Sequence, residues 1–144
     1  MFFLALMLFA TVNTLSLAAQ KYNSDINVTK SELGRVKRHL IFSMKDEQKN
    51  SDCAYTIKDI SKVDKILSEY YDQMEKYRKK NKSDYMILVK TATQSLNDLN
   101  TNCSECLIGK EQGVIIIEFI SKTAYMFGFI DNEMQDLTVE WRKW

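Results

Sequence analysis

Three cysteines are the residues of this chain whose type and spacing could do chemistry. Cys53 stands alone, whereas Cys103 and Cys106 enclose a Cys-x-x-Cys motif. Such a motif supports thiol–disulfide exchange beside a βαβ unit, or it can supply two ligands to zinc. The pattern shows no βαβ unit, and the single histidine, His39, lies on a different predicted helix. We therefore predict a structural disulfide, with no cofactor and no metal site.

Other catalytic signatures are missing from the sequence. A Ser-His-Asp triad needs a histidine, and this chain has only one. The chain also lacks Gly-x-Ser-x-Gly, a phosphate-binding loop and His-Glu-x-x-His. His39 follows Lys37 and Arg38 on a predicted helix, and we interpret all three as surface residues. The sequence therefore predicts a protein that is not an enzyme.

The first residues have the composition of a secretory signal peptide. Residues 2–10 form an apolar run, no charged side chain precedes Lys21, and small residues suit cleavage near Ala19. We predict a signal peptide over 1–19 and one secreted, extracellular domain over 20–144. An uncleaved anchor is the alternative, but polar residues interrupt a run that is already short for a membrane span.

Helical periodicity is the strongest structural signal. The chain has no proline and only four glycines, which favours long helices over many short strands. Apolar residues recur at steps of three and four, and they predict helices near 30–45, 56–80 and 84–100. The apolar stripes are Leu33, Val36, Leu40 and Met44 on the first, Ile57, Ile60, Val63, Leu67, Tyr70, Met74 and Tyr77 on the second, and Tyr85, Leu88, Ala92, Leu96 and Leu99 on the third.

The apolar segment 114–130 suits either two strands or one helix that begins near residue 110. Its β-branched residues favour strands, whereas its length and its lack of turn residues favour a helix. Glu118 and Lys122 also stand at the spacing of a helical ion pair. We predict an all-α fold, a small four-helix bundle with one structural disulfide. The alternative is an α+β fold in which residues 114–140 form strands.

The helix pattern gives the cysteines a geometry. The link between the second and third predicted helices is short, so these helices should be antiparallel neighbours. Cys53 precedes the second helix, and both Cys103 and Cys106 follow the third. A bridge from Cys53 to Cys103, or to Cys106, would close the open end of this hairpin. The remaining thiol would be buried or would form a covalent dimer with another chain.

Charge and other surface signals point to binding surfaces in several places. The formal net charge of +1 gives no support to nucleic-acid binding. Basic side chains cluster at the C-terminal end of the second helix, where they suit the helix dipole or an acidic partner. Two tryptophans near residue 144 suit docking onto the bundle or contact with a partner. The candidate interaction residues are Lys76, Arg78, Lys79, Lys80, Lys82, Trp141 and Trp144, the acidic cluster is Asp131, Glu133, Asp136 and Glu140, and the candidate glycosylation sites are Asn27, Asn81 and Asn102.

The region around the Cys103-Ser104-Glu105-Cys106 motif resembles the short-chain four-helix cytokines of the interleukin-2 and interleukin-15 type. In that family a Cys-x-x-Cys pair precedes a last helix that contains a Phe-Leu step, and Glu118-Phe119-Ile120 matches that step. Ser95-Leu96-Asn97 resembles the family's third helix. The resemblance covers roughly residues 85–132. It implies a secreted signalling ligand and a disulfide to the region of the second helix.

The resemblance carries over no receptor-contact residue. The family uses a late glutamine to contact a shared receptor chain, and the matching register puts Gly128 there. The family also has an up-up-down-down helix order. A link over residues 46–55 is long enough for that order, and up-down-up-down is equally allowed.

Taken together, the residues and the resemblance predict a secreted protein that acts by protein–protein binding. Its partner would be an extracellular or cell-surface, receptor-like protein, and a cytokine-like signalling or immune-modulating ligand is the leading interpretation. One alternative is a carrier whose 114–130 segment lines a cavity for a small apolar ligand. Another is a secreted inhibitor of a host or extracellular protein. We predict no stable membrane span.

Overall fold

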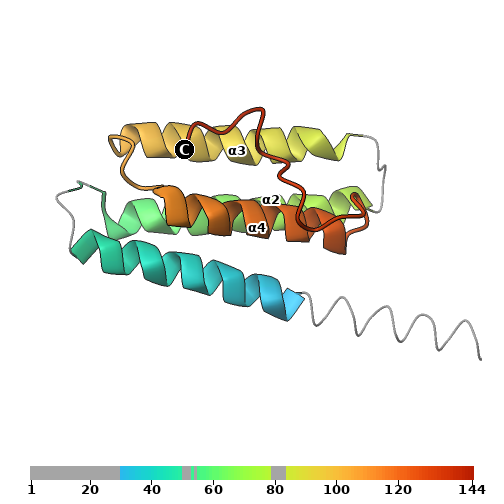
Figure 1. Cartoon of the computed structure of the whole chain (residues 1–144), viewed down its shortest axis with the longest axis horizontal. Helices are drawn as coiled ribbons and strands as arrows, with labels where there is room; N and C mark the ends of the chain where they lie inside the picture. Colours follow the sequence, from blue (N-terminus) through green and yellow to red (C-terminus); the bar gives the residue numbers. More distant parts are fainter. Residues whose placement is uncertain (1–29, 50–52, 54, 79–83) are drawn as a thin grey trace, which may run out of the picture. The chain divides into compact units, whose positions relative to one another are not determined.

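The computed structural model describes residues 30–49, 53, 55–78 and 84–144 (Figure 1). These residues form four helices and no strand: a helix over 30–49, α2 (Ile57–Arg78), α3 (Tyr85–Asn102) and α4 (Lys110–Met126). The all-α prediction is therefore confirmed, and the α+β alternative is not. The predicted signal peptide lies outside the described residues.

The chain divides into two compact units, Met1–Glu32 and Leu33–Trp144. Only residues 30–32 of the first unit are described, as part of the 30–49 helix.

Successive helices run in opposite directions. Lys37 lies 3.1 Å from Asp64 on α2, while Met44, farther along the 30–49 helix, accepts a hydrogen bond from Tyr55, just before α2. These two helices are therefore antiparallel. Gln112, near the start of α4, contacts Glu47 near the end of the 30–49 helix. The order is up-down-up-down (Figure 1), not the up-up-down-down order that the cytokine resemblance implies, because short links join consecutive helices.

The predicted apolar stripes meet in one core. Leu67 on α2, Leu96 on α3 and Ile120 on α4 are all fully buried. The predicted apolar stripe on α2 begins at Ile57, and this part of the prediction was wrong, because Ile57 is 47% exposed. Tyr55 fills the core there instead, and its hydroxyl donates to the Met44 carbonyl over 2.9 Å.

A reciprocal cap starts α2. The Thr56 backbone N–H and hydroxyl both donate to the Asp59 carboxylate, over 2.9 and 2.7 Å. The Asp59 N–H in turn points at the Thr56 hydroxyl. This capping box satisfies backbone donors that the first turn of a helix leaves open. It fixes the first turn of α2 only three residues after the disulfide cysteine Cys53.

We expect Asp59→Asn to destabilise the protein by about 1 kcal/mol at neutral pH, as loss of a cap does. Hydrogen bonds from Lys62 and Thr56 lower the pKa of Asp59 from 3.8 to about 2. A carboxyl whose folded pKa is depressed stabilises the fold above its unfolded pKa. The difference between wild type and variant should therefore be full above about pH 4 and shrink as the pH falls to about 2. Urea unfolding across that range measures it, with the exposed Asp72 changed to Asn as the control.

A left-handed glycine ends α4. Gly128 has φ 72°, the Phe129 N–H donates to the Ala124 carbonyl, and the Gly128 N–H donates to the Tyr125 carbonyl. This pair of bonds is a Schellman motif. The helix therefore stops at Met126 rather than near residue 130 as the sequence predicted.

The segment after α4 is irregular and crosses back over α4 and α3 (Figure 1). Two aromatic pairs hold its start: Phe127 lies 5.4 Å from Tyr71 and Phe129 lies 5.0 Å from Tyr85, between ring centroids. Asn97 on α3 holds its far end. The Asn97 amide donates to the carbonyl of Trp141 over 2.7 Å, and its oxygen accepts from the N–H of Lys143 over 3.0 Å.

Candidate interaction surface

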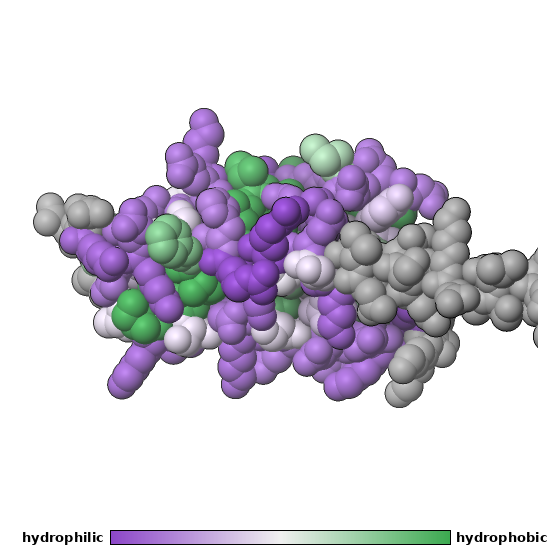
Figure 2. Space-filling model, turned by 90° about the horizontal axis from the view of Figure 1, so that it is seen from below, coloured by the Kyte–Doolittle hydropathy of each residue, from purple (hydrophilic) through white to green (hydrophobic). Residues whose placement is uncertain are grey.

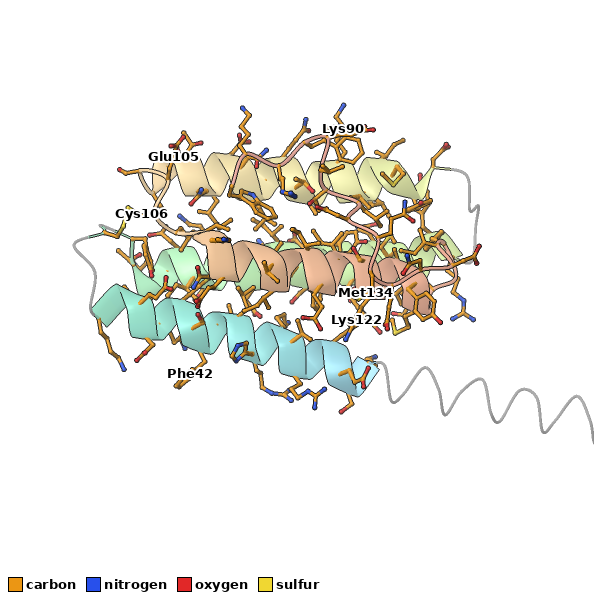
Figure 3. The ribbon with its side chains drawn as sticks, viewed as in Figure 1. Phe42, Lys90, Glu105, Cys106, Lys122 and Met134 are labelled. Carbon is orange, nitrogen blue, oxygen red and sulfur yellow. A yellow bond between two sulfur atoms is a disulfide. The ribbon has the colours of Figure 1, made fainter. Side chains whose placement is uncertain are left out.

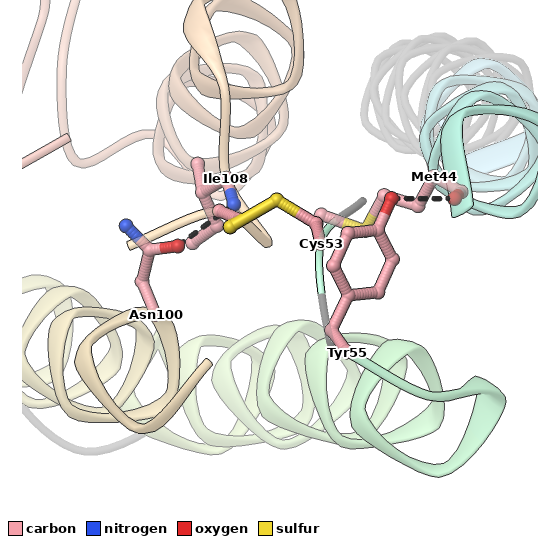
Figure 4. The surroundings of a disulfide bond; sticks show 6 residues. Met44, Cys53, Tyr55, Asn100 and Ile108 are labelled. Atoms are coloured by element: carbon pink, nitrogen blue, oxygen red, sulfur yellow. Dashed lines mark hydrogen bonds between the residues drawn. A yellow bond between two sulfur atoms is a disulfide. The ribbon is translucent and has the colours of Figure 1, made fainter. Parts of the chain in front are cut away.

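The disulfide joins Cys53 to Cys106, with 5.9 Å between their Cα atoms, and Cys103 is free (Figure 4). The predicted bridge is confirmed in its Cys106 form and wrong in its Cys103 form. Cys103 caps the end of α3 and is buried. Ser104 and Glu105 then adopt left-handed conformations, with φ 56° and 59°, and the chain reverses so that Cys106 reaches Cys53.

The Cys103 thiol should react slowly in the native protein. It is 7% exposed, and burial raises its pKa, so little nucleophilic thiolate is present near neutral pH. We expect a maleimide to label Cys103 at least about tenfold faster after unfolding in denaturant than in native buffer. Peptide mass spectrometry should find the label on Cys103 alone. Label on Cys106 would contradict the observed pairing.

The described members of the predicted interaction set lie on two different elements, α2 and the tail after α4. Lys76 is exposed and Arg78 half-buried in the last turn of α2, where cations suit the helix dipole. Trp141 and Trp144 pack against the core, as docking of the tail onto the bundle requires. The remaining members of the basic cluster, Lys79, Lys80 and Lys82, lie outside the described residues, as do the candidate glycosylation sites Asn27 and Asn81.

A different surface combines apolar and basic side chains. A groove of about 470 Å³ runs between the 30–49 helix and α2. Its apolar lining includes Phe42, which is 70% exposed and points away from the bundle (Figure 3). We call this surface the basic groove, and it is lined by Lys37, Arg38, Ile41, Phe42 and Lys45 of the 30–49 helix and by Ile60, Ser61 and Asp64 of α2.

The helical repeat explains how the groove arises. Arg38, Phe42 and Lys45 follow one another at steps of four and three, so they share one face of the 30–49 helix. The stripe that contains Leu40 and Met44 faces the core and leaves this second face outward. The signal in the sequence was an aromatic residue off the core stripe with a cation on either side of it.

One end of the basic groove is held rigidly. The Lys37 ammonium pairs with Asp64 over 3.1 Å and donates to the Ser68 hydroxyl over 2.8 Å. Arg38 and Lys45 are exposed, and no ion pair joins them to another described residue. The groove therefore presents cations around an apolar floor. Figure 2, which views the molecule from below, shows apolar patches among polar side chains on this side.

A second pair of grooves lies between α2 and α3. One of them, about 410 Å³, is lined by Lys62, Glu69 and Asp98 among others and ends at Asn102. Its charges are mixed, and its exposed apolar area is small. Asn102 is exposed at the end of α3, and Cys103 in its sequon carries no disulfide. The predicted glycosylation site is thus accessible in the folded protein.

The described residues contain no group of three or more Cys, His, Asp or Glu side chains placed to hold a metal ion. None of the described helices is both long and apolar enough to cross a membrane. Comparisons with protein-family models, with curated proteins and with solved structures find no match. The surface of the described residues is therefore the basis for a proposed function.

Proposed function

We propose that this protein is a secreted, non-enzymatic ligand that acts by binding another extracellular protein through the basic groove. A cytokine-like signalling or immune-modulating role is the form of this function that we favour, and inhibition of an extracellular protein would use the same surface. The up-down-up-down order means that the role rests on the surface and on the predicted leader, not on cytokine topology.

The observation that carries the proposal is the exposure of Phe42 between two exposed cations, Arg38 and Lys45, on one helix face. An aromatic side chain that is 70% exposed on an ordered helix gains from burial by a partner. Aromatic residues and arginine are the side chains that most often dominate binding energy at interfaces. Arg38 stands one turn from Phe42 on the same face. The groove thus suits a partner segment with carboxylates around an apolar side chain.

The experiment is a binding screen of labelled protein against cells that display a library of membrane proteins. We expect a specific receptor-like partner, and we expect Phe42→Ser with Arg38→Glu to weaken its binding at least about tenfold. The matched control is Ile87→Ser with Lys90→Glu. Ile87 is 58% exposed on α3 and Lys90 points away from the opposite side of the bundle (Figure 3). Equal loss in both variants, or no partner in the screen, would overturn the proposal.

The carrier alternative predicts a different environment for the apolar side chains of α4. A carrier needs apolar side chains that line an open cavity. Ile116, Ile120 and Ala124 are instead 0% exposed and pack in the core. This packing favours the binding function. Native mass spectrometry that detects a co-purified lipid would favour the carrier.

A further inference from the structure

We infer that the basic groove of one molecule binds the turn 131–135 of a second molecule, so that the protein associates head to tail with itself. This inference rests on the proposed use of the groove as a binding surface. In the turn 131–135, two carboxylates precede a large and mostly exposed apolar side chain. Met134 is 82% exposed, and Asp131 and Glu133 beside it are exposed.

The turn is held in shape before it meets a partner. The Asn132 side chain accepts a hydrogen bond from the Met134 N–H over 3.0 Å, and the Asn132 carbonyl accepts one from the Gln135 N–H. The Ser121 hydroxyl on α4 donates to the Gln135 carbonyl. A turn that is already ordered loses little conformational freedom on binding. Met134 is therefore presented as a fixed apolar tip at the end of α4 (Figure 3).

The charges of the two surfaces are complementary. No ion pair joins Asp131 or Glu133 to another described residue, and both are available to meet cations. Arg38 and Lys45 flank the apolar floor of the groove. A methionine sulfur also makes favourable contacts with an aromatic ring such as that of Phe42. The turn thus offers two carboxylates beside an apolar side chain, and the groove offers two cations around an apolar floor.

The turn cannot reach the groove of its own molecule. Gln135 is tied to Ser121, and Asp136 pairs with Arg142 over 2.7 Å. The contact must therefore join two different surfaces on two molecules, which is a heterologous contact. A single turn in a groove is a small interface, so we expect association only at high concentration and a marked weakening by salt.

The experiment is sedimentation velocity on two complementary variants, both in a Cys103→Ala background to exclude a disulfide-linked dimer. The groove variant is Arg38→Glu with Lys45→Glu, and the turn variant is Asp131→Lys with Glu133→Lys. We expect the parent to associate between about 5 µM and 1 mM in low salt, by mass action. Since each variant carries charges of the same sign on its groove and on its turn, each variant alone should stay monomeric.

The mixture of the two variants decides the inference. Each variant keeps one original face, so a turn with acidic residues can still enter an unaltered groove. The two reversed faces are complementary in charge as well, so we expect the mixture to associate although neither variant does alone. A parent that stays monomeric throughout would overturn the inference, as would association that neither variant changes or a mixture that does not associate. The receptor screen is run at nanomolar concentration, where self-association is absent, so it fails or succeeds independently.

Discussion

Replacing both bridged cysteines, Cys53→Ala with Cys106→Ala, is expected to lower the free energy of unfolding by about 4 kcal/mol. The bridge joins residues 53 positions apart, and opening it releases the unfolded chain from a long closed loop. It also ties the approach to α2 to the turn that follows α3, at the end where Tyr55 enters the core. Urea unfolding under non-reducing conditions, followed by circular dichroism, measures the change.

The control for the disulfide prediction is Cys103→Ala. It removes one buried sulfur and no bridge, so we expect a loss of about 1 kcal/mol. The difference in unfolding free energy between the two variants separates the bridging cysteines from the free one. Large and similar losses in Cys103→Ala and in the double variant would show that Cys103, and not Cys106, pairs with Cys53, because both variants would then lose the bridge.

The second large effect is expected at Asn97. Asn97→Ala should lower the free energy of unfolding by about 2–3 kcal/mol, because it leaves two backbone groups of the tail without their partner. These groups are the Trp141 carbonyl and the Lys143 N–H. Asn97 itself is 5% exposed and both bonds are partly buried, so water replaces them only in part while the tail stays docked.

Fluorescence isolates this effect, because Trp141 and Trp144 are the two tryptophans of the chain. Trp144 packs against Gly113 on α4, where an added Cβ would lie 3.1 Å from the indole ring. Loss of the Asn97 contacts should let the tail leave this site, and the emission should shift to longer wavelength before the helices unfold. Gln94→Ala, an exposed change on the same helix, should alter neither emission nor stability. An unchanged emission in Asn97→Ala would show that Asn97 does not hold the tail.

The helices could be predicted from local pattern alone. Steps of three and four placed Leu67, Leu96 and their stripes on buried faces, and the core confirms them. Glu118 and Lys122 pair over 2.9 Å, as their spacing predicted. Helix ends were harder, because they depend on single residues. Gly128 ends α4 through its left-handed conformation. The Thr56–Asp59 cap begins α2, and the apolar periodicity does not reveal that cap.

The interaction surface was not predicted, since exposure depends on which neighbour covers each helix face. Phe42 stands off the core stripe in the sequence, but only the packing of α2 beside the 30–49 helix forms the groove that Phe42 lines. Trp141 and Trp144 suited either docking onto the bundle or contact with a partner, and the tertiary structure packs both against the core.

By itself, the sequence determined the fold class and brought the three cysteines to one end of a hairpin, because helical periodicity and a short link are local properties. Only the tertiary structure decided which cysteine pairs with Cys53. The last turn of α3 buries Cys103, and two left-handed residues carry Cys106 outward to the bridge. It also decided the order of the helices and the place of the basic groove, since both arise from contacts between residues far apart in the chain.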